Sequence, residues 1–464
     1  MEKFFEKHDL IKVSGIMVLL TVLLTWLIPY GYFSGSEMVV QDITRVGLTS
    51  FFQYGLLGVY YFTVLVTFLL VLGGFYQVLG KTLGYQKLVK NVSSKLKGKE
   101  VIAVLVSMFV FAVLASVTNE YFPLLVFVPF VVTVLSRIKV DKISAFCATF
   151  GGLLVGTIGG TYGAKVVGFI NTTLGTTVKT FIGAKIALFV LAYVCLAVFT
   201  ARRVKQVAKS ADESYDKFEV ADPGRKSAKV WPYIVGGCLI FVATVLAYLP
   251  WDTFKVTAFE SATTWVNELS IAGVPIISYI CGEFVAFGSW DIFTIQFVLL
   301  FATLLIHWFG RVKFDDVVDS FGEGFAKMAP VVIVLLFVYL ILEFAVMFPV
   351  VPVIVDWFAT ISEKFNVVWN SIAIFITSLF GVEMQYVMSL SGTYYAAMFA
   401  GSTKVLAIMY QAMFGLVSFF APSSAILMIG LSYLGIPYKD WMKYIWKFLV
   451  AMLLVIIIVL IIVA

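Results

Sequence analysis

Long apolar runs that are nearly free of charge limit most strongly what this sequence can fold into. About 20 apolar residues in a helix cross the hydrocarbon core of a bilayer, and many segments of this chain reach that length. Charged residues make up only 13% of the chain, against about 25% in soluble domains. The sequence therefore predicts an all-α polytopic membrane protein. The clear runs are 13–29, 57–79, 181–201, 231–250, 290–309, 330–348 and 444–464.

Four further apolar regions are interrupted by Gly, Pro, Asn, Ser and Thr. Such interruptions predict re-entrant hairpins or broken helices, because unwound backbone at membrane depth must line a cavity or be buried in protein. In the first region, both ends adjoin basic loops, so it must enter the membrane and return, with 118–120 near its turn. The four regions are 101–136, 143–175, 366–400 and 404–435.

Lysine and arginine cluster in short connections, notably 80–100 and 202–230, whereas 30–56 and 251–289 hold one basic residue each. The positive-inside rule places the basic connections in the cytoplasm. We therefore expect a multi-pass protein of the cytoplasmic membrane, with its amino terminus inside and its carboxy terminus outside. The outer segment includes a stretch, 257–269, that is expected to be an amphipathic helix at the interface.

The second half of the chain resembles an inverted copy of the first. In each half, one apolar span is followed by two interrupted regions and a terminal apolar helix, and the two halves start from opposite sides. This arrangement predicts an inverted-repeat secondary transporter. The expected parts are an accessory span (1–44), a first repeat (45–203), a connecting unit (204–319) and a second repeat (320–464).

Polar residues gather at four places within the interrupted regions. A carboxylate at membrane depth is costly, so Glu120 and Glu383 are functional candidates, although each could lie at an ordinary surface turn. Glycines and Pro422 favour unwound helices whose ends bind charged groups, or, alternatively, close helix packing. Lys165 could pair with a carboxylate or reach an interface. The predicted substrate-binding residues are Thr118, Asn119, Glu120, Gly160, Thr161, Asn171, Glu383, Ser391, Gly392, Thr393, Pro422, Ser423 and Ser424.

Other kinds of site are not indicated. His8 and His307 are the only histidines, and the four cysteines lie singly in or beside apolar runs, where we expect small core residues. No cofactor, metal site or catalytic constellation is expected. Residues 74–82 do not have the glycine spacing of a phosphate-binding loop, so this chain alone is not an ATP-driven pump.

Short motifs occur in a fixed order at 68–75, 80–82, 96–100, 119–124, 151–163, 421–424, 427–428 and 436–441. In this order and spacing they resemble the YfcC-type transporter family of the ion transporter superfamily, which is related to the anaerobic four-carbon dicarboxylate carriers. Two positions depart from that family: Asn119-Glu120 stands where it tends to have two adjacent acids, and Asn171-Thr172-Thr173 lies near its Asn-Pro-Phe. The resemblance covers about 45–175 and 380–464.

The resemblance implies a scaffold part, a mobile transport part and a homodimer, with a substrate site between the broken regions. We therefore expect an elevator-like secondary carrier of a small polar organic solute, an amino acid or a carboxylate. It would be driven by exchange or by coupling to Na⁺ or H⁺, with Glu120 or Glu383 as the proton carrier. Two alternatives stay open: a membrane enzyme or assembly subunit without transport activity, and a passive channel.

Overall fold

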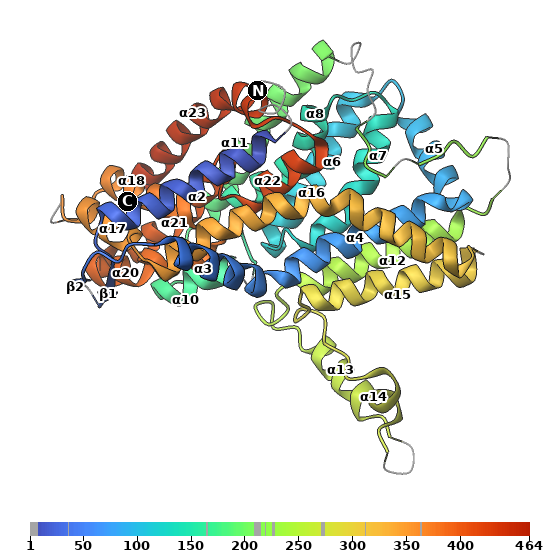
Figure 1. Cartoon of the computed structure of the whole chain (residues 1–464), viewed down its shortest axis with the longest axis horizontal. Helices are drawn as coiled ribbons and strands as arrows, with labels where there is room; N and C mark the ends of the chain where they lie inside the picture. The colour runs from blue at the N-terminus through green and yellow to red at the C-terminus, as the bar shows by residue number, and fades with distance from the viewer. Residues whose placement is uncertain are drawn as a thin grey trace.

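The computed structural model describes residues 8–35, 37–163, 166–207, 215–218, 220–224, 228–270, 274–310, 312–361 and 364–464. The helices of this part of the chain are accompanied by one two-stranded antiparallel hairpin and by irregular connections. Eight of its helices are long and apolar enough to cross a membrane. The expected all-α polytopic membrane fold is therefore confirmed (Figure 1).

The elements up to the middle of the chain are α2 (Asp9–Leu27), β1 (Gly31–Ser34), β2 (Glu37–Val40), α3 (Leu48–Tyr61), α4 (Thr63–Lys81), α5 (Leu83–Leu96), α6 (Glu100–Thr118), η1 (Pro123–Phe127), α7 (Val128–Arg137), α8 (Lys142–Phe146), η2 (Cys147–Gly151), α9 (Gly152–Ile158), α10 (Val166–Leu174) and α11 (Ile182–Val207).

The remaining elements are α12 (Trp231–Tyr248), α13 (Ala258–Glu268), α14 (Ile276–Cys281), α15 (Ile292–Gly310), α16 (Phe314–Met347), α17 (Val351–Ala359), α18 (Val367–Phe380), α19 (Met384–Val387), η3 (Met388–Gly392), α20 (Thr393–Met398), η4 (Ala400–Ser402), α21 (Thr403–Val417), α22 (Ala425–Leu434) and α23 (Tyr438–Val463).

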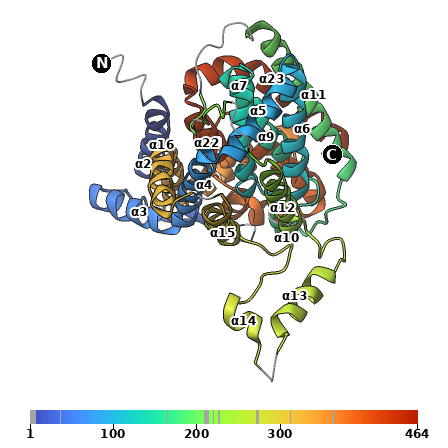
Figure 2. The same ribbon diagram turned by 90° about the vertical axis from the view of Figure 1, so that its right-hand side faces the viewer.

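One group of helices is built around α4 and α16, which run antiparallel along each other. The ring of Phe62 stacks on that of Tyr339 at 3.6 Å at one end of the pair. Nearer the other end, a Cβ added at Gly73 would lie 2.6 Å from the carbonyl oxygen of Gly324, so only glycine permits this approach. Helices α2, α3 and α15 pack on the same pair. We call α2, α3, α4, α15 and α16 the first body (Figure 2).

The other group surrounds α9 and α21. Helix α6 packs along α9, α21 lies against α9, α10 and α18, and the two long helices α11 and α23 contact each other on the outside. Helix α22 lies between the two groups, packed on α16 and against the α8–η2–α9 region. We call the α6–α11 region together with α18, α21 and α23 the second body (Figure 2).

Both predicted helix breaks in the second body are confirmed. Helix α9 ends at Ile158, and the chain is unwound through 159–163; helix α21 ends at Val417, and α22 begins only at Ala425. Region 101–136 is a hairpin whose arms, α6 and η1–α7, are joined by the turn at 119–122. Asn119 caps α6 in the left-handed conformation (φ 51°), which asparagine tolerates better than most residues.

Several features were not predicted. These are the β1–β2 hairpin, the π-helical turns η2 and η3, and α14. The stretch expected as an amphipathic helix is α13, which extends from the bundle with α14 (Figure 1). The expectation that all four cysteines are core residues is wrong, because Cys238 and Cys281 are exposed on α12 and α14. Apolar surroundings in the sequence do not distinguish a core position from a lipid-facing one.

Candidate functional site

The two broken helices cross where the first of them unwinds. A Cβ added at Gly415 of α21 would lie 2.6 Å from the Cα of Ile158, the last residue of α9. One turn earlier on α21, Gln411 Nε2 donates hydrogen bonds to the carbonyl oxygens of Gly160, at 2.7 Å, and Ile158, at 3.3 Å. A side chain of the second half therefore satisfies carbonyls that the break in the first half sets free.

The end of α6 holds the same unwound segment from the other side. Ser116 Oγ donates to the Gly159 carbonyl at 2.6 Å, and the Ser116 carbonyl accepts from the backbone N–H of Thr161 at 2.7 Å. Asn119 packs directly on Gly160 and Gly163, where an added Cβ would lie 2.5 and 2.2 Å from its side chain. The glycines at these positions admit the asparagine side chain.

A small cavity lies where the two halves meet. Its volume is about 10 Å³, which is room for about one water molecule. Four hydroxyl-bearing residues line it: Tyr121, Thr157 beside the first break, and Ser418 and Ser424 at the second. Tyr121 follows Glu120, and Val382 precedes Glu383. The lining residues are Tyr121, Leu154, Thr157, Val382, Phe414, Ser418, Ser424, Ala425 and Ile426.

Both predicted carboxylates are sequence neighbours of residues that line this cavity, and each lies in a short connection between helices. Glu383 precedes α19, and its Oε1 accepts a hydrogen bond from the hydroxyl of Tyr339 at 3.0 Å. Glu383 lies in the short segment after α18 of the second body, and Tyr339 is on α16, so this bond joins the two bodies. Glu120 is half-buried, and its backbone N–H donates to Thr118 Oγ1 at 3.2 Å. Thr118 Oγ1 itself donates to the carbonyl of Leu114 at 2.8 Å.

The predicted residues of the Pro-Ser segment are at the second break. Ser424 Oγ caps α22 by accepting from the N–H of Leu427 at 3.4 Å. Ser423 is buried, and its hydroxyl has no hydrogen-bond partner among the described residues. Pro422 is half-buried between the two helices. The first turn of α22 therefore faces the cavity through Ser424, Ala425 and Ile426.

The other predicted residues form a separate cluster along η3 and α10. Ser391 Oγ lies 2.8 Å from the hydroxyl of Tyr410, and an added Cβ at Gly392 would lie 3.1 Å from Thr173 Cγ2 on α10. Asn171 Oδ1 accepts from Thr176 Oγ1 at 2.8 Å, and Thr393 is exposed. None of these four predicted residues lines the small cavity.

Several side chains of the site were not among the predicted residues. Besides Gln411, Tyr339 and Tyr410, they include Ser116, Tyr121, Thr157 and Ser418. Gln411 could have been noticed as an amide in an apolar run, but Tyr339 and Tyr410 give no such signal in the sequence. Lys165 lies outside the described residues. Within the described part of the chain, no three His, Cys, Asp or Glu side chains come together in a way that would hold a metal ion.

Comparison with known proteins gives one family. No curated protein matches the chain. Among solved structures, the YdaH transporter of Alcanivorax borkumensis is 14% identical, with 97% of this chain and 98% of that chain covered and a TM-score of 0.40. The sequence model of the DcuC family, described as C4-dicarboxylate anaerobic carriers, matches residues 8–464. This chain therefore belongs to the DcuC carrier family of multi-pass membrane proteins.

Proposed function

We propose that this chain is a secondary active carrier of a small polar organic solute, and that C4-dicarboxylates are the first class to test. The crossing of the two broken helices carries the proposal, because Gln411 of one half completes the hydrogen bonding of Gly160 in the other. Carriers place their substrates where such discontinuous helices meet. The family description supports a dicarboxylate as the solute. A carrier of this kind needs no catalytic residues.

The first turn of α22 is the part of the site that best suits a carboxylate. The amino-terminal end of a helix presents backbone N–H groups and a partial positive charge, and this turn faces the cavity beside the Thr157 and Ser418 hydroxyls. A dicarboxylate is larger than one water molecule. Substrate binding therefore requires the cavity to expand.

We further propose an elevator-like cycle in which the first body is the scaffold and the second body moves. The two bodies suit these roles because each is closely packed within itself and α22 lies between them. The proposal includes the inverted-repeat boundaries 45–203 and 320–464, a homodimer in the cytoplasmic membrane, and an amino terminus in the cytoplasm. The two 26-residue helices α11 and α23, each of which ends its half, support the repeat.

The coupling ion is proposed to be Na⁺ or H⁺. For Na⁺, the support is that Asn119 Oδ1 and Gln411 Oε1 are buried without hydrogen-bond partners among the described residues, and both side chains contact Gly160. Amide and backbone carbonyl oxygens are ligands for hard cations. For H⁺, the candidates are Glu120 and Glu383. Transport that depends on Na⁺ would favour the amide oxygens as the ion site. Transport that depends on pH but not on Na⁺ would favour the carboxylates.

Counterflow in vesicles tests the carrier proposal. Vesicles that contain the purified protein and concentrated succinate are diluted into labelled succinate, fumarate or aspartate, with and without Na⁺. A carrier gives saturable accumulation that depends on the internal solute. Flux without saturation would indicate a channel, and no flux of any solute would contradict the proposal. In E120Q/E383Q, the pH dependence of counterflow should disappear, whereas Glu268→Gln on the exposed α13 should behave as the wild type.

A further inference from the structure

The connection between α11 and α12 returns to the bundle and packs on both bodies. We call its residues 215–218 and 220–224 the strap. Phe218 is only 2% exposed. Its ring stacks at 6.1 Å on that of Tyr76 from α4 and lies 6.3 Å from that of Tyr433 on α22. One side chain of the strap is therefore clamped between the first body and the helix that separates the two bodies.

Two consecutive strap residues bind opposite bodies. Lys217 Nζ donates to the carbonyl oxygen of Lys327 on α16 at 3.3 Å. The Asp216 carboxylate interacts with the side chain of Thr133 on α7. It also accepts from the N–H of Phe218 at 3.2 Å, which fixes the local turn. Adjacent Cα atoms are about 3.8 Å apart, so these bonds leave little freedom between α7 and α16.

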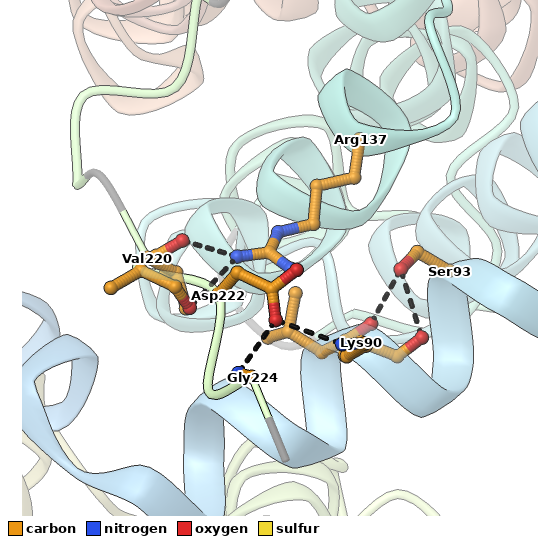
Figure 3. Close-up of polar contacts among 8 residues, drawn as sticks. Lys90, Ser93, Arg137, Val220, Asp222 and Gly224 are labelled. Carbon is orange, nitrogen blue, oxygen red and sulfur yellow. Dashed lines mark hydrogen bonds and ion pairs between the residues drawn. The ribbon is translucent and has the colours of Figure 1, made fainter.

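The rest of the strap is held by charged side chains (Figure 3). Arg137, the last residue of α7, donates to the carbonyl oxygens of Val220 and, at 3.2 Å, Ala221. Lys90 on α5, which continues from α4, pairs with Asp222 at 2.8 Å. The Asp222 carboxylate also accepts from the N–H of Gly224 at 2.9 Å. The strap therefore joins α7 of the second body to the α4–α5 arm as well as to α16.

We propose that the strap is a latch that fastens the second body to the first body and must release from one of them for the bodies to slide. The proposal rests on the carrier cycle proposed above. A slide of one helical turn is about 5.4 Å, and a hydrogen bond longer than about 3.5 Å is no longer a bond. The bonds to α7 and to α16 thus cannot both persist through such a movement.

The two ends of the strap differ in strength. The Lys90–Asp222 pair has side chains that are 41% and 67% exposed, so water and salt weaken it. By contrast, the Phe218 ring is buried and the Lys217 bond is partly buried. Release therefore begins at the exposed Asp222–Lys90 pair on α5 and spreads to the Arg137 bonds and the Asp216 contact with α7, while the Phe218 ring stays with α4.

Distance measurements between the bodies test the latch without requiring a substrate. Spin labels are placed at Lys205 on α11 and Asp319 on α16, which are both exposed, after replacement of the four native cysteines. The distance distribution is measured by pulsed electron paramagnetic resonance in lipid. Arg137→Gln removes the bonds to the strap carbonyls, and Asp222→Asn, a milder change, weakens the ion pair.

We expect each variant to raise the population of a second distance, by about tenfold for Arg137→Gln, which corresponds to about 1.4 kcal/mol. Asp440→Asn weakens an exposed pair with Lys443 that lies outside the strap and should leave the distribution unchanged. Distributions that match the wild type in both strap variants would overturn the latch. Counterflow is measured on the same proteins: its absence in the wild type counts against the carrier proposal, while the distances still decide the latch.

Discussion

Replacing Gly415 by alanine is the most direct test of the helix crossing at the candidate site. The added Cβ would lie 2.6 Å from Ile158 Cα and 2.7 Å from Ile158 N, about 0.8 Å short of the 3.4 Å at which ordinary contact begins. Both atoms are backbone, so no side chain can rotate away. Helix α21 is buried from Val405 to Val417, so it has little room in which to move aside.

Two opposing effects determine how much Gly415→Ala changes the stability of the protein. Alanine favours a helix over glycine by up to about 1 kcal/mol. Overpacking costs about 1 to 3 kcal/mol, and moving α21 also strains the two Gln411 hydrogen bonds, each of which contributes about 1 kcal/mol. We therefore expect Gly415→Ala to destabilise the protein by about 2 kcal/mol and to reduce counterflow, because the segment at Gly160 loses its support.

Gly168→Ala is the matched control, since nothing lies within 4 Å of the Cβ it adds to α10. It should keep or gain stability through helix propensity alone. Melting temperatures are compared by thermal unfolding in detergent at one scan rate, because membrane proteins often unfold irreversibly. A Gly415→Ala protein that melts at or above the temperature of Gly168→Ala would refute the close crossing.

Two further predictions concern groups that join the bodies. Burial raises the pKa of the Asp216 carboxyl to about 6, although Arg137 and Lys327 act in the opposite direction. The attached strap therefore holds this proton more tightly than the free strap, so attachment weakens as pH rises between about 4 and 6. Asp216→Asn should abolish this pH dependence of the spin-label distances. If the pH dependence persists in the variant, the Asp216 carboxyl is not its cause. Tyr339→Phe removes the hydroxyl that binds Glu383 and should lower the melting temperature by the equivalent of about 1 kcal/mol, whereas an unchanged temperature would show that the bond contributes nothing.

The membrane-spanning helices and the helix breaks were predictable because their signals are local. Apolar runs set the spans, and the glycines before Tyr162 and the proline at 422 marked the unwound segments. The pairing of Gln411 with Gly160 was not predictable, because the two residues are 251 positions apart. The strap was missed for a similar reason. In the sequence, its residues belong to a charged connection between two apolar spans. Only the folded structure shows that Phe218 contacts Tyr76 and Tyr433.

The candidate site was predicted in part. Ser424 lines the cavity and Gly160 and Asn119 support it, but Asn171, Ser391, Gly392 and Thr393 belong to another cluster. Sequence position showed that these residues are polar within apolar regions. It did not show on which face of η3 or α10 they lie. At η3, the π-helical turn changes the helix period, so helical spacing does not predict the face.

The size of the central cavity has an electrical consequence. A space of about 10 Å³ cannot contain a continuous file of water molecules across the protein. Protons cross membranes rapidly along such files, and small ions need a hydrated path or a series of polar ligands. While the cavity is this small, it should provide no water-filled path for protons between the two halves, so that vesicles containing the protein without substrate should keep an imposed proton gradient as long as protein-free vesicles do.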